Sequence, residues 1–134
     1  MMKPLAIAAA GLAALAASPL AAQDREERAE TAFQELVEGR TAGEAQRCIT
    51  TFDSNRLRVE ENVGLVYERS GVLWVARARN PQHLGSWDVP IIQRYSGSRL
   101  CTTDVTHTID RSTGQFSGVL FLEDFVPYTE VEQG

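Results

Sequence analysis

The sequence is poor in the residues that most often bind metals or perform catalysis. It holds only 2 His and 2 Cys, and no further ligand accompanies His83 or His107 at the spacing of a metal site. A Gly-x-Ser-x-Gly nucleophile elbow, a Walker A loop and a dinucleotide-binding glycine pattern are also missing. We therefore expect no metal, no cofactor and no catalytic residue.

Lysine is almost absent as well. Lys3 is the only one, and the arginines that supply the other positive charges are dispersed along the chain. The formal net charge is −5, whereas proteins that bind nucleic acids present clustered positive charge to the phosphates. The composition therefore argues against a nucleic-acid partner.

The chain has one long hydrophobic run, at its beginning. Residues 5–17 are Leu, Ile, Ala and Gly only, Lys3 precedes them, and a pair of alanines stands before Gln23. This is the pattern of a secretory signal peptide, and the run is shorter than the roughly 20 residues that cross a bilayer. We predict a signal peptide at residues 1–22, a single domain at 23–134, a periplasmic or secreted location and no integral membrane span.

The two cysteines, Cys48 and Cys101, are expected to form a disulfide bond. Thiols of an exported protein usually pair, because the periplasm is kept oxidising. A bridge between them would stabilise the domain by about 4 kcal/mol in the chain-entropy account. A redox-active pair is not expected, because the sequence has no Cys-x-x-Cys motif.

Residues 24–38 have the periodicity of an amphipathic helix. Their apolar side chains recur every three or four positions, at Ala29, Ala32, Phe33, Leu36 and Val37. Gly39 is a typical residue at which a helix ends. We expect a loop at residues 40–47 to lead from the helix to Cys48.

From Cys48 onward, β-branched and aromatic residues alternate with polar ones, which predicts strands. Ser70-Gly71 has the composition of a two-residue hairpin turn, which would place Tyr67 opposite Trp74. In the tail, Phe125 and Tyr128 are expected to pack onto the sheet. The expected strands are residues 49–52, 57–60, 63–69, 72–78, 89–95, 99–101, 104–110 and 116–122. We predict an α+β fold, in which an N-terminal amphipathic helix packs on a curled antiparallel sheet or small barrel of six to seven strands.

Three residues are candidates for a binding surface: Trp87, Asp104 and His107. Trp87 lies where a loop meets a strand, and large aromatic side chains dominate interface energetics. His107 shares a strand face with Val105 and Ile109, which predicts a histidine on the core side that is either hydrogen-bonded in the core or half-buried. Asp104 immediately precedes that strand.

Several motifs give the chain a resemblance to a known group of proteins. The motifs are residues 33–41, the Leu100-Cys101-x-x-Asp104 element, the turn at residues 110–114 and the Phe125-Val126-Pro127-Tyr128 element. With these motifs the chain resembles a family of small exported alphaproteobacterial proteins of unknown function. The resemblance implies a single periplasmic or secreted domain and carries no activity.

The leading functional hypothesis is a non-enzymatic protein that binds another protein or a component of the cell envelope. One alternative is a small-ligand carrier, with Trp74, Val105 and Phe121 lining the inside of the curled sheet. A third hypothesis is a hydrolase that uses His107. The sequence does not decide among these three hypotheses.

Overall fold

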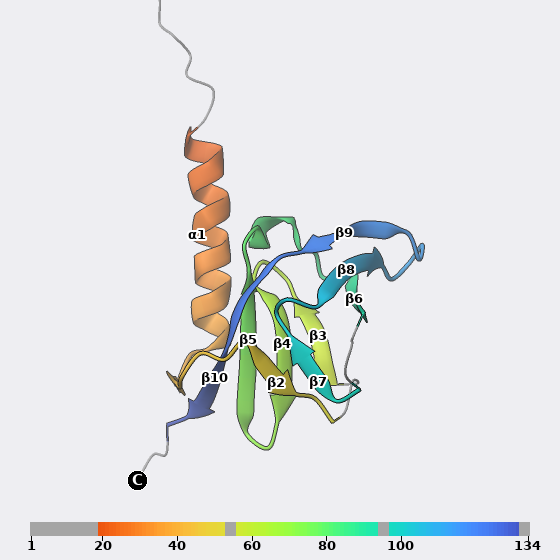
Figure 1. Cartoon of the computed structure of the whole chain (residues 1–134). Helices are drawn as coiled ribbons and strands as arrows, with labels where there is room; N and C mark the ends of the chain where they lie inside the picture. The colour runs from red at the N-terminus through yellow and green to blue at the C-terminus, as the bar shows by residue number, and fades with distance from the viewer. Residues whose placement is uncertain (1–18, 53–55, 94–96, 132–134) are drawn as a thin grey trace, which may run out of the picture.

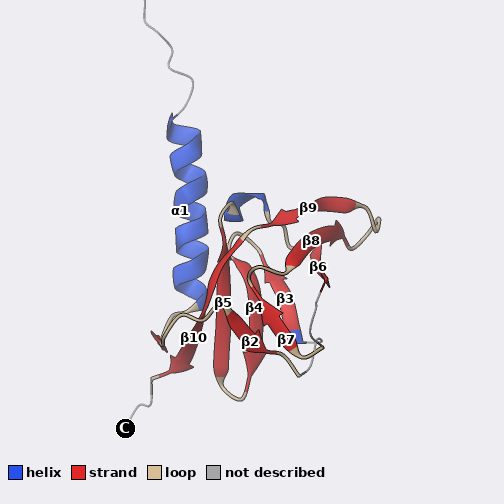
Figure 2. Cartoon of the chain, in the orientation of Figure 1, coloured by secondary structure: helices blue, strands red, loops and turns tan. Residues whose placement is uncertain are grey.

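The fold of the protein was obtained as a computed structural model that describes residues 19–52, 56–93 and 97–131. Most of the expected signal peptide, residues 1–18, lies outside this part of the chain. The elements, in chain order, are α1 (Pro19–Leu36), β1 (Arg40–Ala42), β2 (Cys48–Thr50), β3 (Leu57–Glu60), β4 (Gly64–Arg69), β5 (Val72–Ala78), the 3₁₀ helix η2 (Pro81–His83), β6 (Asp88–Gln93), β7 (Arg99–Cys101), β8 (Val105–Asp110), β9 (Phe116–Leu120) and β10 (Leu122–Glu130). Figure 2 shows that strands dominate beside one long helix. No helix among the described residues is long and apolar enough to cross a membrane.

The strands form three antiparallel sheets rather than one. The main sheet has five strands in the order β1-β10-β5-β4-β3, a ribbon pairs β2 with β7, and a third sheet has the order β6-β8-β9. The α+β class is therefore confirmed, but the prediction of one curled sheet or barrel of six to seven strands is wrong. The sheets are open, because their strand orders are linear and the first and last strands of the two larger sheets do not pair in the described chain.

Both faces of the main sheet are covered, which gives the molecule three layers (Figure 1). On one face, Val66 and Val75 pack with Phe33 of α1. On the other face, Tyr67 and Phe125 pack in a core cluster that includes residues of both smaller sheets. This double coverage explains why β4 is buried along most of its length, with Leu65 and Val66 at 0% exposure.

Helix α1 uses the apolar positions that its periodicity predicts. Ala29 and Phe33 are buried, and Ala32, Leu36 and Val37 pack beside them. Arg77 of the main sheet holds the helix in place, because its guanidinium lies 4.1 Å from the centre of the Phe33 ring and its Nη2 lies 2.9 Å from Glu30 Oε2. The helix begins at Pro19 rather than at residue 24, since proline is tolerated in the first turn.

The predicted Ser70-Gly71 hairpin is confirmed. Tyr67 lies opposite Trp74 in the pairing of β4 with β5. Ser70 and Gly71 both have positive φ, 54° and 78°, which is the backbone of a turn whose twist matches the flanking strands.

Two strands lie where the sequence predicted a loop and a packed tail. β1 occupies part of the expected loop at residues 40–47, and it pairs with the end of β10. Pro127 stands inside β10, where its missing N–H would disrupt a central ladder. Its carbonyl accepts the Gly43 N–H at 2.7 Å, so its nitrogen also points to the side where β1 has ended. The pairing of β10 with β5 therefore needs no N–H from Pro127.

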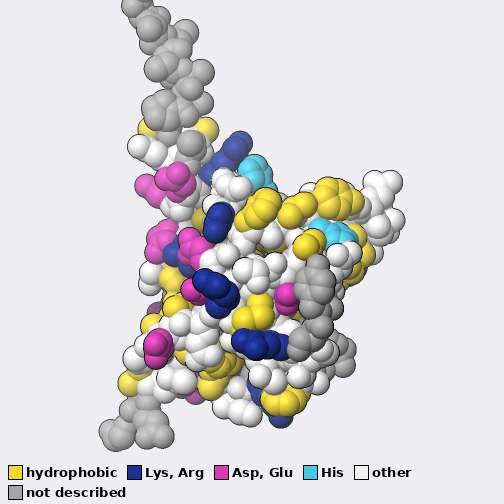
Figure 3. All heavy atoms as spheres, in the orientation of Figure 1, with side chains coloured by type: hydrophobic (Ala, Val, Ile, Leu, Met, Phe, Trp, Pro, Cys, Tyr) yellow, Lys and Arg dark blue, Asp and Glu magenta, His cyan; other side chains and the backbone are white. Residues whose placement is uncertain are grey.

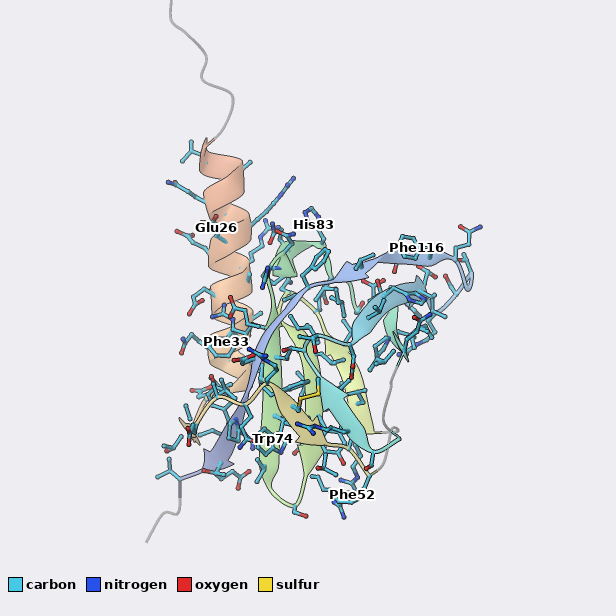
Figure 4. The ribbon with its side chains drawn as sticks, in the orientation of Figure 1. Glu26, Phe33, Phe52, Trp74, His83 and Phe116 are labelled. Atoms are coloured by element: carbon cyan, nitrogen blue, oxygen red, sulfur yellow. A yellow bond between two sulfur atoms is a disulfide. The ribbon has the colours of Figure 1, made fainter. Side chains whose placement is uncertain are left out.

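The predicted disulfide is present. Cys48 in β2 and Cys101 in β7 lie directly opposite each other, with Cα atoms 4.0 Å apart. The ribbon that they join contributes Ile49 and Leu100 to the core. The disulfide thus fastens a two-stranded ribbon across the main sheet (Figure 4).

Candidate functional site

The sheet formed by β6, β8 and β9 has an apolar face that no other part of the described chain covers. Residues in register across the three strands lie on the same side of the sheet, so Ile91, His107 and Val119 form one row. The face comprises Val89, Ile91, Val105, His107, Ile109, Phe116 and Val119, and it is called the outer face below. Figure 3 shows hydrophobic side chains along this edge of the molecule.

Exposure separates the outer face from the opposite side of the same strands. Phe116 is 65% exposed, Val119 52% and Val105 49%. Their sequence neighbours on the inner side, such as Thr106 and Leu120, are buried. The sheet therefore presents its large apolar side chains outward.

This orientation corrects the prediction for β8. The sequence placed Val105, His107 and Ile109 toward the core, whereas the buried side chains of the strand are Thr106 and Thr108. His107 is half-buried as predicted, but it lies on the outer face, with its ring centre 5.9 Å from that of Phe116.

Threonine is accepted on the inner side because its hydroxyls bond to the backbone. Thr106 Oγ1 lies 3.4 Å from the Asp104 carbonyl, and Thr108 Oγ1 lies 3.5 Å from that of Gly118. Among the described residues, no buried side-chain nitrogen or oxygen lacks a hydrogen-bond partner. Burial of these two hydroxyls therefore leaves no unsatisfied polar group.

The β8–β9 hairpin that carries the outer face is held by a carboxylate in its turn. Asp110 accepts hydrogen bonds from the Ser112 hydroxyl and from the N–H groups of Ser112, at 2.8 Å, and Thr113, at 3.1 Å. These bonds, the Ser112 hydroxyl foremost, hold the pKa of Asp110 below its ordinary value. The turn thereby fixes where β9 begins and where Phe116 stands.

Ser117 and His107 are not joined as a nucleophile and its base. The Ser117 hydroxyl donates to Asp88 Oδ1 at 2.8 Å and lies 2.7 Å from Thr108 Oγ1. In the described part of the chain, neither of these bonds involves the His107 imidazole, which contacts the Phe116 ring. The serine therefore fastens β9 to β8 and β6.

The three predicted binding residues all belong to this sheet or its borders, but they do not converge. Trp87 precedes β6 at the end where Asp88 pairs with Asp110, whereas Asp104 precedes the opposite end of β8. Six residues of strand separate the two ends, about 20 Å. Trp87 is 62% exposed, and His107 lies between the ends. This dispersal fits an extended surface better than one enclosed pocket.

Asp104 has a clear structural role. Its Oδ2 accepts the Cys101 N–H at 2.9 Å, and its own N–H donates to the Cys101 carbonyl at 3.0 Å. Leu100 beside them is fully buried. Each residue of this element thus has a structural role: Leu100 packs in the core, Cys101 forms the disulfide, and Asp104 holds the turn that follows.

The Phe125–Tyr128 element also serves the fold. Phe125 is fully buried, and the Tyr128 ring meets the Phe33 ring edge-on at 5.9 Å. Burial raises the pKa of the Tyr128 hydroxyl. The Leu100-Cys101-x-x-Asp104 and Phe125–Tyr128 elements therefore position strands rather than reactive groups.

A depression of about 460 Å³ opens next to the outer face, where β8 begins and β9 ends. Arg79, the apolar residues Val105, Val119, Leu120, Phe121 and Leu122, and the segment from Thr102 to Thr106 line it. The Arg79 backbone N–H donates to the Phe121 carbonyl at 2.9 Å, which fixes the backbone of Arg79 beside the depression. Within the described chain, the Arg79 guanidinium forms no ion pair and no hydrogen bond.

Sequence reasoning missed Arg79, Ile91, Phe116 and Val119. Each lies in a strand or next to one, and alternation alone does not tell which side of a strand is covered. One feature of β8 could have indicated the exposed face. One face of this strand is apolar and the other is rich in threonine, so either face could be the inner one. Among the described residues, no group of three or more metal-ligating side chains comes together.

Comparisons with known proteins add no functional information. The chain matches no protein family, no curated protein and no solved structure. The geometry of the outer face and the depression beside it is therefore the basis for any functional assignment.

Proposed function

We propose that this chain is an exported, non-enzymatic binding domain that holds a protein partner on its outer face. The observation that carries the proposal is the outward exposure of Ile91, Val105, Phe116 and Val119 on one sheet. Single exposed apolar side chains are ordinary, but a continuous apolar face on a small domain is typical of an interaction site.

The residue types support a protein partner. Exposed aromatic side chains give large contact area at low entropic cost, and Phe116 and Trp87 both qualify. A sheet that is buried on its inner side and held by a hydrogen-bonded hairpin turn would present Phe116 with little rearrangement. The disulfide supports an oxidising compartment, which is where the signal pattern would send the chain.

Site-specific photo-crosslinking tests this proposal. A benzophenone amino acid would replace Phe116, and, as the matched control, Phe52, which is 70% exposed and lies far from Phe116 (Figure 4). In periplasmic extract, we expect a discrete adduct from position 116 and none from position 52.

The partner identified from the adduct would then be purified and titrated against Val119→Asp. Binding should weaken at least about tenfold, because a charge would be buried in an apolar contact. Adducts that are equal at the two positions, or unchanged affinity of Val119→Asp, would refute the proposal. Folding should be unaffected, because Val119 is half-exposed and such surface changes stay within about 0.5 kcal/mol.

The two alternative functions fare differently. The carrier hypothesis placed Trp74, Val105 and Phe121 inside a curled sheet, but Trp74 packs in the core while the other two line the outer depression. A ligand site, if present, therefore belongs to that depression. For a hydrolase, no specific observation favours His107 as a base.

A further inference from the structure

The depression beside the outer face combines two properties that a ligand site for an amphipathic molecule needs. Its wall is largely apolar, with Val105, Val119 and Phe121 contributing exposed surface. Arg79 is an exposed residue of the same lining, and its guanidinium has no ion-pair or hydrogen-bond partner among the described residues. A volume of about 460 Å³ lies within the usual range of small-molecule sites, about 300–1,000 Å³.

We propose that this depression binds a free single-chain amphiphile with an anionic head, such as a fatty-acid carboxylate. The carboxylate would pair with Arg79, whose planar group can donate two parallel hydrogen bonds. The hydrocarbon chain would lie against Val119 and Phe121, which removes apolar surface of both partners from water. The inference goes beyond the proposed function, because it needs no protein partner on the outer face.

The charges around the depression determine the polarity of the ligand. Two carboxylates lie on the other side of the balance: Asp104 lines the depression and accepts the Cys101 N–H, and Asp124 accepts a hydrogen bond from the lining residue Thr102. Both keep their negative charge, so an anionic head has to lie away from them, at Arg79. Arg79 is therefore the side chain with unused donors, and it lies where β5 has ended and the main sheet meets β9. An anionic head would be attracted to the Arg79 side, whereas a cationic head would meet Arg79 unfavourably.

The concave shape of the site favours a free amphiphile over a membrane surface as the ligand. A bilayer would contact the most protruding side chains, whereas a single hydrocarbon chain fits the depression where β8 begins and β9 ends. The net charge of −5 further disfavours adsorption to anionic lipid. We therefore commit to the free amphiphile and treat adsorption to vesicles as an outcome of the test.

Isothermal titration with three twelve-carbon probes, each below its micelle concentration or, for the alcohol, below its solubility limit, tests the inference on the full oxidised chain. The probes are dodecanoate, dodecanol and dodecylammonium, which share the chain and differ in head charge. We expect saturable binding in the order dodecanoate, then dodecanol, then dodecylammonium. Absence of saturable dodecanoate binding, or equal affinity for the three probes, would overturn it.

Two arginine variants assign the charge. Arg79→Gln should weaken dodecanoate at least about tenfold, the usual effect of losing a charge-assisted hydrogen bond, and should leave dodecanol unchanged. Arg111→Gln is the matched control, because Arg111 is exposed in the hairpin turn at the other end of β8. Equal loss in both variants would show that net charge alone acts and would contradict the assigned site.

The apolar wall is tested from the ligand side and from the protein side. Phe121→Ser should weaken the binding of dodecanoate and of dodecanol alike. When dodecanoate is added to the wild type, amide chemical shifts should change at residues 102–106 and 119–122. Shifts confined to other residues, or binding only to vesicles of anionic phospholipid, would refute the site. Failure here leaves the crosslinking result at Phe116 unaffected, so the two proposals can fail separately.

Discussion

The disulfide should account for a large part of the stability of this fold. Cys48 and Cys101 are 53 residues apart in the sequence, so the bond removes much freedom from the unfolded chain. The chain-entropy relation gives about 4 kcal/mol at 25 °C for a loop of this length. Small domains have total stabilities of about 5–15 kcal/mol. Replacing both cysteines with serine should therefore leave a folded but marginal protein.

The local structure indicates where the loss would be felt first. The β2–β7 ribbon has only three residue pairs, and isolated two-stranded ribbons are marginal in water. Ile49 and Leu100 of this ribbon are nevertheless part of the core. In the double serine variant, we expect amide exchange in β2 and β7 to become much faster than in the wild type, and exchange in β4 and β5 to change less.

Equilibrium urea unfolding of the wild type and of the double serine variant measures the total effect. The wild type with reductant should behave like the variant, and a double alanine variant separates bond loss from the cost of burying two hydroxyls. A loss below about 1 kcal/mol in both variants would refute the reasoning. So would equal exchange rates throughout the sheets, because the bond would then not protect the ribbon selectively.

Three further predictions follow from single contacts. Gly64→Ala should destabilise by about 3 kcal/mol or more in urea unfolding, because the new Cβ would lie 2.2 Å from a backbone oxygen of β5; a loss below 1 kcal/mol would contradict this. The pKa of Glu30 is lowered by the hydrogen bond from Gln34 and by Arg77, so its stabilising effect exists above the ordinary pKa of 4.5 and is lost as pH falls through the lowered value. Glu30→Gln should thus be less stable than the wild type at pH 7, by at most about 0.5 kcal/mol for so exposed a pair. The urea midpoints of the two proteins should converge once the pH falls below the lowered pKa of Glu30, and a constant difference would exclude the ion pair as the cause. Burial raises the pKa of Tyr128, so its contribution is complete below the ordinary value of 10.0 and is lost as pH rises through the raised value; Tyr128→Phe should therefore lose less stability than the wild type between pH 9 and pH 11.

Local patterns in the sequence predicted local structure well. The apolar positions of α1, the Ser70-Gly71 turn and the boundaries of β3, β5 and β7 depend on neighbours close in the chain, and these are confirmed. The disulfide also followed from compartment and composition alone. Such features require no knowledge of which strands meet.

The partition into three sheets could not be predicted in the same way. β10 pairs with β1 and β5, which are far from it in the sequence. The residues of β10 do not indicate which strands it pairs with. Pro127 is unusual in a strand that is paired on both sides, and it is tolerated because β1 ends beside it. The pairing of distant segments depends on the apolar surface that the whole fold buries. The pattern of residues within one strand does not contain this information.

The orientation of β8 is where sequence and structure disagree most, and the disagreement points to function. Alternation is compatible with either face inward, and the apolar face would normally be buried. Here the threonine face is inside, bonded to the backbone, while Val105 and the Phe116 and Val119 side chains of β9 remain in water. Leaving these side chains exposed forgoes about 25 cal/mol for each Å² that could be buried. Natural sequences that keep such a local conflict tend to do so at functional sites, so the outer face is where a partner should be sought first.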